Sequence, residues 1–185
     1  MRFLVWTGVE EWMTEAAEVE LTDGGLRATG TQLGADPVPY RVDYRLECPD
    51  DYVTRELELT ATTESGQRHL LLTHDGQGGW QADGHHDLPD LSDARDIDIQ
   101  NSPLTNTMPI LRHGFQRGGE GDFLMAFVTM PALRVEASPQ RYEHVSAGGN
   151  GSVVRYLSRD GDFTAELELD DEGLLVFYPR LARRV

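Results

Sequence analysis

The sequence predicts a mainly β protein whose short strands form one largely antiparallel sheet. Three observations support this fold class: segments in which apolar and polar residues alternate, turns rich in glycine and aspartate between them, and a length of 185 residues, which suits one domain with one core. We therefore expect residues 1–185 to form a single domain. A sheet with so many strands must curl into a barrel, fold into a sandwich or wrap around another element, because one of its faces has to be buried.

The first half of the chain contains the clearest strand signals. Near the N-terminus, "VELTDGGLRATGTQLG" is typical of a hairpin, whereas "EEWMTEAAEVEL" also allows a short helix because its alternation begins only at Ala17. The segments "YRVDYRLE" and "RELELTATT" both alternate with period two, and the "PDD" turn between them predicts an antiparallel pair. The stretch "HLLLTHDGQGGWQADG" then predicts a third strand, a glycine-rich turn and a fourth strand that contains Trp80.

The second half repeats this pattern. The segment "SVVRYLSRDGDFTAELELDDEGLLVFYP" predicts further strands, with turns at "RDGD" and "DDEG". Before it, "DFLMAFVTMP" lacks alternation, so we expect it to be covered on both faces or to line an apolar interior. It is therefore the candidate for the most buried strand.

Residues 83–112 separate the two halves and form the longest stretch without strand periodicity, which is where function is expected. Within it, "RDIDI" predicts a short strand in which Asp98 points away from its isoleucine neighbours. The stretch "SPLTNTMPILR" fits neither a helix nor a strand, because Pro103 and Pro109 disfavour helix in the residues before them. We expect a rigid crossover that closes one end of the sheet's concavity, and polar side chains that mainly bond backbone groups.

The charge of the chain narrows the choice of partners. It has 32 acidic residues and 16 basic residues, all of them arginine, which gives a net charge of −16. This composition is similar to that of proteins from salt-accumulating halophiles, in which salt screens the self-repulsion of an acidic chain. We therefore expect neither nucleic acid nor anionic membrane surfaces as partners.

Other features predict a cytoplasmic protein without a membrane span, a metal or another cofactor. The first residues, "MRFLVW", lack the apolar region of an export signal, and the longest apolar runs are far shorter than the roughly 18 residues that cross a bilayer. Cys48 is the single cysteine and has no thiol partner. His85 and His86 are adjacent, so on an extended chain they point to opposite faces and do not share an ion. The oligomeric state is left open.

The sequence lacks motifs for catalysis. It contains no G-x-S-x-G elbow, and the runs "GQGG" and "GGNG" lack the lysine of a phosphate-binding loop. Asp96 and Asp98 share one side of a predicted strand, with Cα atoms roughly 7 Å apart, and paired carboxylates are typical of glycosidases. In so acidic a chain such a pair also arises by chance. Arg112 follows the rigid segment and either pairs with one of these aspartates or binds the sugar or phosphate head of a ligand.

Four segments together resemble one known family, the glycolipid-binding proteins of bacteria and archaea. They are "GGWQADG", "DLPDLSDARDIDIQNSPLTNTMPILR", "QRYEHV" and "DDEGLLVFYPRLARR". These match the family's tryptophan strand, its D-x-D segment that leads into P-x-T-N-T-x-P-I, its Q-x-Y strand and its closing D-x-x-G-x-x-x-x-Y-P. Arg95 stands where many members carry a cysteine, which argues against general thiol chemistry at that position.

The resemblance implies a highly curved antiparallel sheet that forms a half-barrel or incomplete barrel with little helix, similar to periplasmic lipoprotein carriers. It also implies non-catalytic binding of a lipid, glycolipid or similar amphipathic small molecule in an apolar concavity. Burial of an acyl chain contributes about 0.8 kcal/mol per CH₂, so such binding needs no catalytic group. The side chains expected either to line the concavity or to fill the core are Tyr40, Tyr44, Trp80, Phe123, Met125, Phe127, Phe163 and Phe177.

The candidate ligand-binding residues are Tyr44, Trp80, Asp96, Asp98, Asn101, Thr105, Asn106, Thr107, Arg112 and Phe127. Among them, Asn106 and Thr107 are expected to offer hydrogen bonds to a polar head group. Two alternatives stay open. One is a hydrolase or isomerase that acts on a glycoside or lipid through Asp96, Asp98 and Arg112, and the other is a protein-interaction module that pairs through its sheet edge and has no small ligand.

Overall fold

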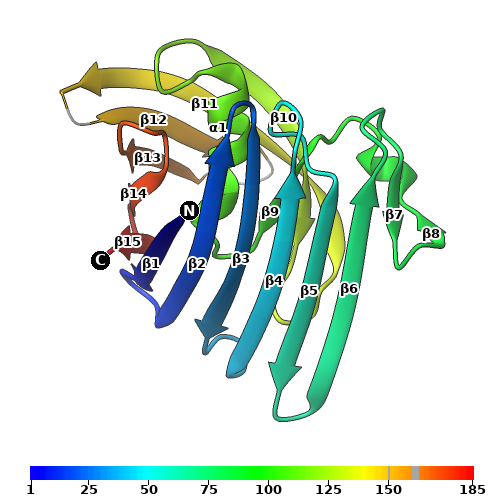
Figure 1. Ribbon diagram of the computed structural model, residues 1–185. Helices are drawn as coiled ribbons and strands as arrows, with labels where there is room; N and C mark the ends of the chain where they lie inside the picture. Colours follow the sequence, from blue (N-terminus) through cyan, green and yellow to red (C-terminus); the bar gives the residue numbers. More distant parts are fainter. Residues whose placement is uncertain (150, 160–162) are drawn as a thin grey trace.

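The fold is one open β-sheet that curves around a short helical segment (Figure 1). The computed structural model describes residues 1–149, 151–159 and 163–185. Across these residues, fifteen strands lie in the order β8-β7-β6-β5-β4-β3-β2-β1-β15-β14-β13-β12-β11-β10-β9. Neighbours pair antiparallel except β9 and β10, which pair parallel. The predicted fold class, a mainly β and strongly curved antiparallel sheet that does not close into a barrel, is confirmed.

The first half of the sheet is a series of strands joined by turns. These strands are β1 (Arg2–Gly8), β2 (Met13–Thr22), β3 (Gly25–Gly34), β4 (Tyr40–Cys48), β5 (Glu56–Thr63), β6 (Gly66–His74), β7 (Trp80–Ala82) and β8 (His86–Asp87). The predicted hairpin near the N-terminus is β2–β3, and the predicted antiparallel pair is β4–β5. Alternation explains both, since on β4 every second side chain from Tyr40 to Cys48 is buried.

A helix near residue 12, which the sequence allowed, does not form. β2 begins at Met13, and the side chains of Met13, Glu15 and Ala17 all face the interior. The inward alternation therefore starts four residues before Ala17. It is hidden in the sequence because a charged residue, Glu15, occupies a core position.

The second half of the sheet returns the chain to its start. It contains β9 (Asp96–Ile99), β10 (Glu120–Val128), β11 (Val135–Gly148), β12 (Gly151–Ser158), β13 (Thr164–Leu169), β14 (Leu175–Tyr178) and β15 (Ala182–Arg184). β15 pairs with β1 and places Arg184 opposite Trp6, so the two halves join through the first and last strands. The predicted "DDEG" turn lies between β13 and β14, whereas the predicted "RDGD" turn falls mainly on residues 160–162, outside the described residues.

The expectation that "DFLMAFVTMP" is the most buried strand is wrong. On β10, Phe123, Leu124 and Phe127 are half-buried, while Met125 and Ala126 are buried. β9 is more deeply buried, because three of its four residues are shielded from solvent. Met125 and Ala126 are adjacent, so their side chains point to opposite faces of β10, and both are buried. The strand is therefore covered on both faces at that position.

The segment "SPLTNTMPILR" is helical, contrary to its prediction as an irregular turn. It contains the 3-10 helix η2 (Leu104–Asn106) and α1 (Thr107–His113), and another 3-10 turn, η1 (Pro89–Leu91), precedes β9. Pro109 is tolerated because it lies in the first turn of α1, where a backbone N–H has no intrahelical partner. No helix among the described residues is long and apolar enough to cross a membrane.

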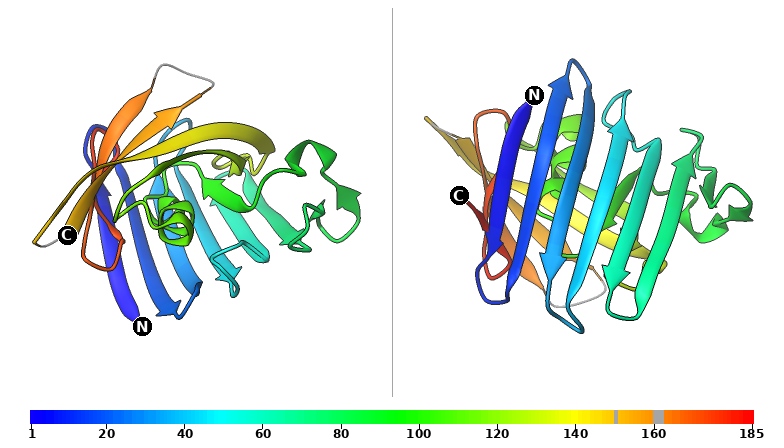
Figure 2. Two further views of the ribbon diagram at one scale, coloured as in Figure 1. Left: turned by 90° about the horizontal axis from the view of Figure 1, so that it is seen from above. Right: turned by 60° about the horizontal axis from the view of Figure 1, so that its bottom comes forward.

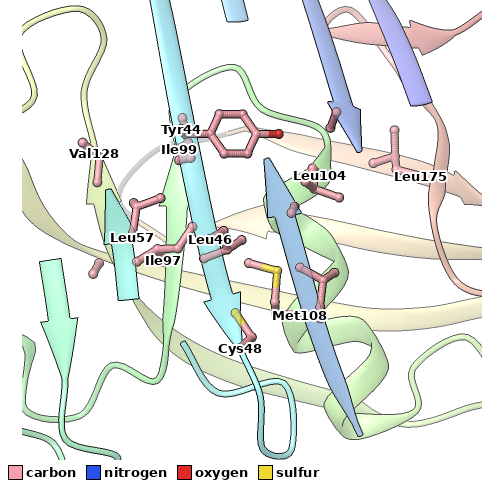
Figure 3. Close-up of a cluster of buried hydrophobic side chains, with 14 of the residues drawn as sticks. Tyr44, Leu46, Cys48, Leu57, Ile97, Ile99, Leu104, Met108, Val128 and Leu175 are labelled. Atoms are coloured by element: carbon pink, nitrogen blue, oxygen red, sulfur yellow. The ribbon is translucent and has the colours of Figure 1, made fainter. Parts of the chain in front are cut away.

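We call residues 100–113 the crossover. Figure 2 shows it inside the curve of the sheet, rather than as the predicted lid at one end. Leu104, Met108 and Ile110 have no exposed surface, and with β9 they form the middle of the core. Figure 3 shows Leu104 and Met108 in one cluster of buried hydrophobic side chains with Leu46 of β4. The centre of the concavity is therefore filled by the chain itself.

Candidate ligand-binding site

A pocket of ≈ 310 Å³ lies beside the crossover, and we call it the crossover pocket. Polar residues from β9 and the crossover form part of its lining: Asp98, Gln100, Asn101, Ser102 and Asn106. Apolar and aromatic residues form the rest: Ile99, Phe127, Tyr156, Phe163, Tyr178 and Leu181. The pocket therefore combines hydrogen-bonding groups with four aromatic rings.

Two other hollows differ in composition. One of ≈ 530 Å³ lies at the C-terminal end of α1, and one of ≈ 380 Å³ lies beside Trp80 near the β6–β7 turn. Each is lined by a single Phe, Tyr or Trp residue. The crossover pocket is therefore the better candidate site for an amphipathic ligand, because such sites combine apolar rings with a few polar groups.

Three of the four rings form one continuous aromatic surface. The ring centroids of Tyr156 and Phe163 are 6.1 Å apart, those of Tyr156 and Tyr178 are 6.0 Å apart, and those of Phe163 and Tyr178 are 6.2 Å apart. These distances are typical of rings in direct contact. Tyr142 extends the surface inward, with its centroid 5.5 Å from that of Tyr156. β11, β12 and β14 supply the three tyrosines.

Asp98 is held by one hydrogen bond on each carboxylate oxygen. Thr105 Oγ1 donates to Oδ1 at 2.9 Å, and Gln140 Nε2 donates to Oδ2 at 2.7 Å. Burial raises the pKa of Asp98 to about 6, although the bonds from Gln140 and Thr105 oppose the rise. A carboxylate has about four acceptor positions, so each oxygen keeps one position for a further donor.

A chain of buried hydrogen bonds leads from Asp98 to the first half of the sheet. Tyr142 Oη donates to Gln140 Oε1 at 3.0 Å and also lies 2.9 Å from Asn106 Oδ1. The Asn106 side chain contacts the Ser102 carbonyl at 3.5 Å, and Ser102 Oγ donates to Glu15 Oε1 at 2.8 Å. Buried networks of this kind fix side-chain positions when their members are satisfied. The polar lining is thus connected by hydrogen bonds to residues behind it.

Glu15 ends this network in the core. Tyr44 Oη donates to Glu15 Oε1 at 2.6 Å, whereas Glu15 Oε2 is buried and has no hydrogen-bond partner among the described residues. Burial raises the pKa of Glu15 from 4.5 to about 7, against the lowering effect of its bonds with Tyr44 and Ser102. A carboxyl group in this position favours its neutral form.

Asn101 connects the crossover pocket to a smaller one. It adopts a left-handed backbone conformation, with φ of 64°, which asparagine tolerates better than most residues. Asn101, Phe163 and Leu181 line both the crossover pocket and the neighbouring pocket of ≈ 180 Å³. The smaller pocket also contains Arg180, whose Nε lies 3.2 Å from Glu10 Oε2. The two pockets therefore adjoin, and the arginine that lines the smaller one is paired with Glu10.

Four of the ten predicted binding residues line the crossover pocket: Asp98, Asn101, Asn106 and Phe127. Thr105 supports Asp98 from behind, and Tyr44 bonds Glu15 in the core. Thr107 is also buried, and its hydroxyl has no partner among the described residues. These last three residues are outside the pocket lining.

The remaining predicted residues have other contacts. Asp96 and Arg112 form a buried bidentate ion pair, one of the two pairings expected for Arg112. Trp80 donates from Nε1 to the Ala94 carbonyl at 2.9 Å and stacks on His74, with ring centroids 4.6 Å apart. Trp80 is thus a buried anchor for the loop before β9, and it lies in a different hollow from Asp98.

The sequence pattern predicted the positions of some aromatic residues and missed others. Tyr40 and Tyr44 fill the core, which was the second of the two expectations for these rings. Phe177 lies on the side of β14 opposite to Tyr178. There the Cζ atom of Arg183 lies 4.8 Å from the centroid of the Phe177 ring. Tyr156 and Tyr178 were missed, although alternation along β12 and the Y-P motif at the end of β14 offered a signal for each.

Glu15 and Gln140 were also missed. Gln140 belongs to the Q-x-Y segment, which was noted as a motif without a role for its side chain. Glu15 gave no local signal, because its partners Tyr44 and Ser102 come from distant segments. Within residues 1–149, 151–159 and 163–185, no group of three or more His, Cys, Asp or Glu side chains is arranged to hold a metal ion.

Comparisons with known proteins agree with this fold. A family model described as "Putative glycolipid-binding" matches residues 3–184. The crystal structure of a DUF1089 family protein from Pseudomonas aeruginosa is similar over 92% of each chain, with a TM-score of 0.79 and 32% sequence identity. No curated protein matches the chain. Because the family model spans almost the whole sequence, this protein is a member of the family with that description.

Proposed function

We propose that this protein binds an amphipathic small molecule, such as a glycolipid, in the crossover pocket and does so without catalysis. The observation that carries the proposal is the composition of this pocket, in which a continuous aromatic surface and a set of supported polar side chains share one cavity. Small-molecule sites commonly have this composition, because apolar contacts supply affinity and a few polar groups fix orientation. The family description supports the same class of ligand.

The size of the pocket limits what it can hold. Small-molecule sites usually have volumes of roughly 300–1,000 Å³, so ≈ 310 Å³ suits a head group or a short chain rather than an entire lipid. The adjoining pocket, with Met13, Phe163 and Leu181 in its lining, offers a direction for the remainder of the ligand. We propose that the head group occupies the crossover pocket and that the alkyl portion extends toward the adjoining pocket.

The two alternatives have weaker support. The hydrolase or isomerase required Asp96, Asp98 and Arg112 to act together, but Asp96 and Arg112 neutralise each other in a buried ion pair. Neither of them lines the pocket that contains Asp98. A protein-interaction module would use the edge strands β8 and β9, but β8 is only two residues long and β9 is buried in the core. Short edge strands are poor templates for pairing.

Extraction of the purified protein with organic solvent, followed by mass spectrometry, tests for a bound amphiphile directly. We expect a co-purifying molecule with one polar and one apolar part. Titration with octyl amphiphiles in molar salt is the second measurement. Repeated extracts without an amphiphile, together with no binding of any octyl amphiphile, would overturn the proposal.

A pair of phenylalanine variants locates the site. Phe127 lines the crossover pocket, while Phe123 lies on the same face of β10, is also half-buried and is outside the pocket. We expect Phe127→Ala to weaken amphiphile binding by about tenfold, since an aromatic ring provides a large apolar contact. Phe123→Ala should leave the affinity close to that of the unmodified protein. Equal losses in both variants would place the ligand elsewhere.

A further inference from the structure

Four large hydrophobic side chains remain exposed at one end of the sheet. We call them the apolar rim, and they are Val9, Trp12, Leu33 and Val38. Val9 and Trp12 belong to the turn between β1 and β2 (residues 9–12), and Val38 belongs to the turn between β3 and β4 (residues 35–39). Met13 pairs with Gly34, and Gly34 pairs with Tyr40, so these two turns are neighbours (Figure 1).

The apolar rim borders the smaller pocket that adjoins the crossover pocket. The lining of this adjoining pocket includes Glu11 and Met13, and Trp12 lies between them in the sequence. Val9 donates its backbone N–H to the carbonyl of Leu181, another lining residue, at 3.0 Å. The rim therefore lies where we propose that the alkyl portion of the ligand extends.

We infer that the apolar rim inserts into the surface of a zwitterionic lipid bilayer, so that the adjoining pocket meets the lipid when a ligand enters or leaves. Tryptophan favours the level of the lipid head groups, because its ring is apolar while its N–H stays hydrated. The inference goes beyond the proposed function. It rests on that function only for the reason why a lipid surface should meet the pocket.

The charges beside the rim favour a zwitterionic surface over the other partners. Glu10, Glu11 and Asp36 lie in the same two turns, and Arg180 is already paired with Glu10. These carboxylates would be repelled by an anionic surface, whereas they can lie beside the ammonium groups of a lipid such as phosphatidylcholine. A second copy of the chain is a poor partner for the same reason, because its acidic turns would face these turns.

The tryptophans of the protein provide a direct readout. Trp12 is 66% exposed, whereas Trp6 and Trp80 are buried. A change of tryptophan emission on contact with lipid therefore reports mainly on Trp12. Titration of the full chain with phosphatidylcholine vesicles in molar salt should shift the emission to shorter wavelength and protect it from quenching by acrylamide. Flotation with the same vesicles measures the affinity.

Three variants test the position of the contact. Trp12→Ala should weaken vesicle binding about tenfold or more, because it removes the largest apolar side chain of the rim. Val38→Asp should also weaken it, because a charged side chain is costly to bring into lipid. Phe3→Ala is the matched control, since Phe3 is 69% exposed and lies opposite Glu18 on β2, outside the rim and the pocket lining. It should bind vesicles as the unmodified protein does.

The outcomes separate this inference from the proposed function. Absence of vesicle binding by the unmodified protein overturns the inference even when octyl amphiphiles bind. Equal losses in Trp12→Ala and Phe3→Ala also overturn it, as does tighter binding to vesicles of anionic lipid than to phosphatidylcholine. Vesicle binding that depends on Trp12, without binding of any octyl amphiphile, supports the inference and counts against the proposed function.

Discussion

Replacement of Glu15 by glutamine should stabilise the protein at neutral pH and remove part of its pH dependence. In the folded state burial raises the pKa of Glu15 from 4.5 to about 7, so the folded state holds this proton at pH values where the unfolded chain has released it. The contribution to stability is therefore fully present below pH 4.5 and is lost as the pH rises through about 7. A pKa difference of this size corresponds to about 3 kcal/mol.

Glutamine at position 15 resembles the protonated form of the glutamate. Its carbonyl oxygen can still accept the hydrogen bonds that Tyr44 and Ser102 donate to Glu15 Oε1. Its amide nitrogen takes the place of Oε2, which has no partner among the described residues in either case. The variant therefore keeps the contacts and removes the titration.

Urea unfolding at a series of pH values and constant salt measures the effect. We expect the unmodified protein to lose up to about 3 kcal/mol relative to Glu15→Gln between pH 4.5 and pH 8. Glu18→Gln, on the exposed side of β2, provides the same change of charge without burial and should follow the unmodified protein. Parallel pH profiles for the unmodified protein and Glu15→Gln would refute the reasoning, because they would mean that burial does not raise this pKa.

Two further predictions concern the core. Arg112→Met should lower the free energy of unfolding by about 3–5 kcal/mol because it leaves the buried Asp96 unpaired. The double variant with Asp96→Leu should recover most of that loss. If the second substitution does not restore stability, the cost does not come from an unpaired charge. Gly30→Ala should destabilise the protein by about 1–3 kcal/mol, because an added Cβ would lie 2.4 Å from the Tyr44 ring. Gly148→Ala, where an added Cβ meets no atom of the described residues within 4 Å, is the control. Equal melting temperatures for the two glycine variants would contradict the prediction.

The strands were predictable because their signal is local. Alternation on β4 and β5 follows from which side chains face the core, and the turn residues between strands mark where the chain reverses. The crossover was mispredicted because a proline is unfavourable within a helix but acceptable in its first turn. The position of Pro109 in α1 is decided by packing of Met108 and Ile110 under the sheet, and no local pattern shows that.

The candidate site was predictable to a similar extent. Asp98, Asn101 and Asn106 were identified because they lie in one interrupted segment. Tyr156 and Tyr178 were not, because they meet that segment only after the sheet has curved over the crossover. Curvature depends on contacts between strands far apart in the chain, so the aromatic surface becomes visible only in three dimensions.

The pairing of β1 with β15 affects how the chain must assemble. Because Trp6 lies opposite Arg184, the seam between the two halves brings together residues that are far apart in the sequence. Such long-range contacts carry a high entropic cost before they give any stabilisation, and proteins dominated by them fold in milliseconds to seconds rather than microseconds. During synthesis, therefore, the hairpins of the first half can form early, but the seam has to wait until β15 has left the ribosome.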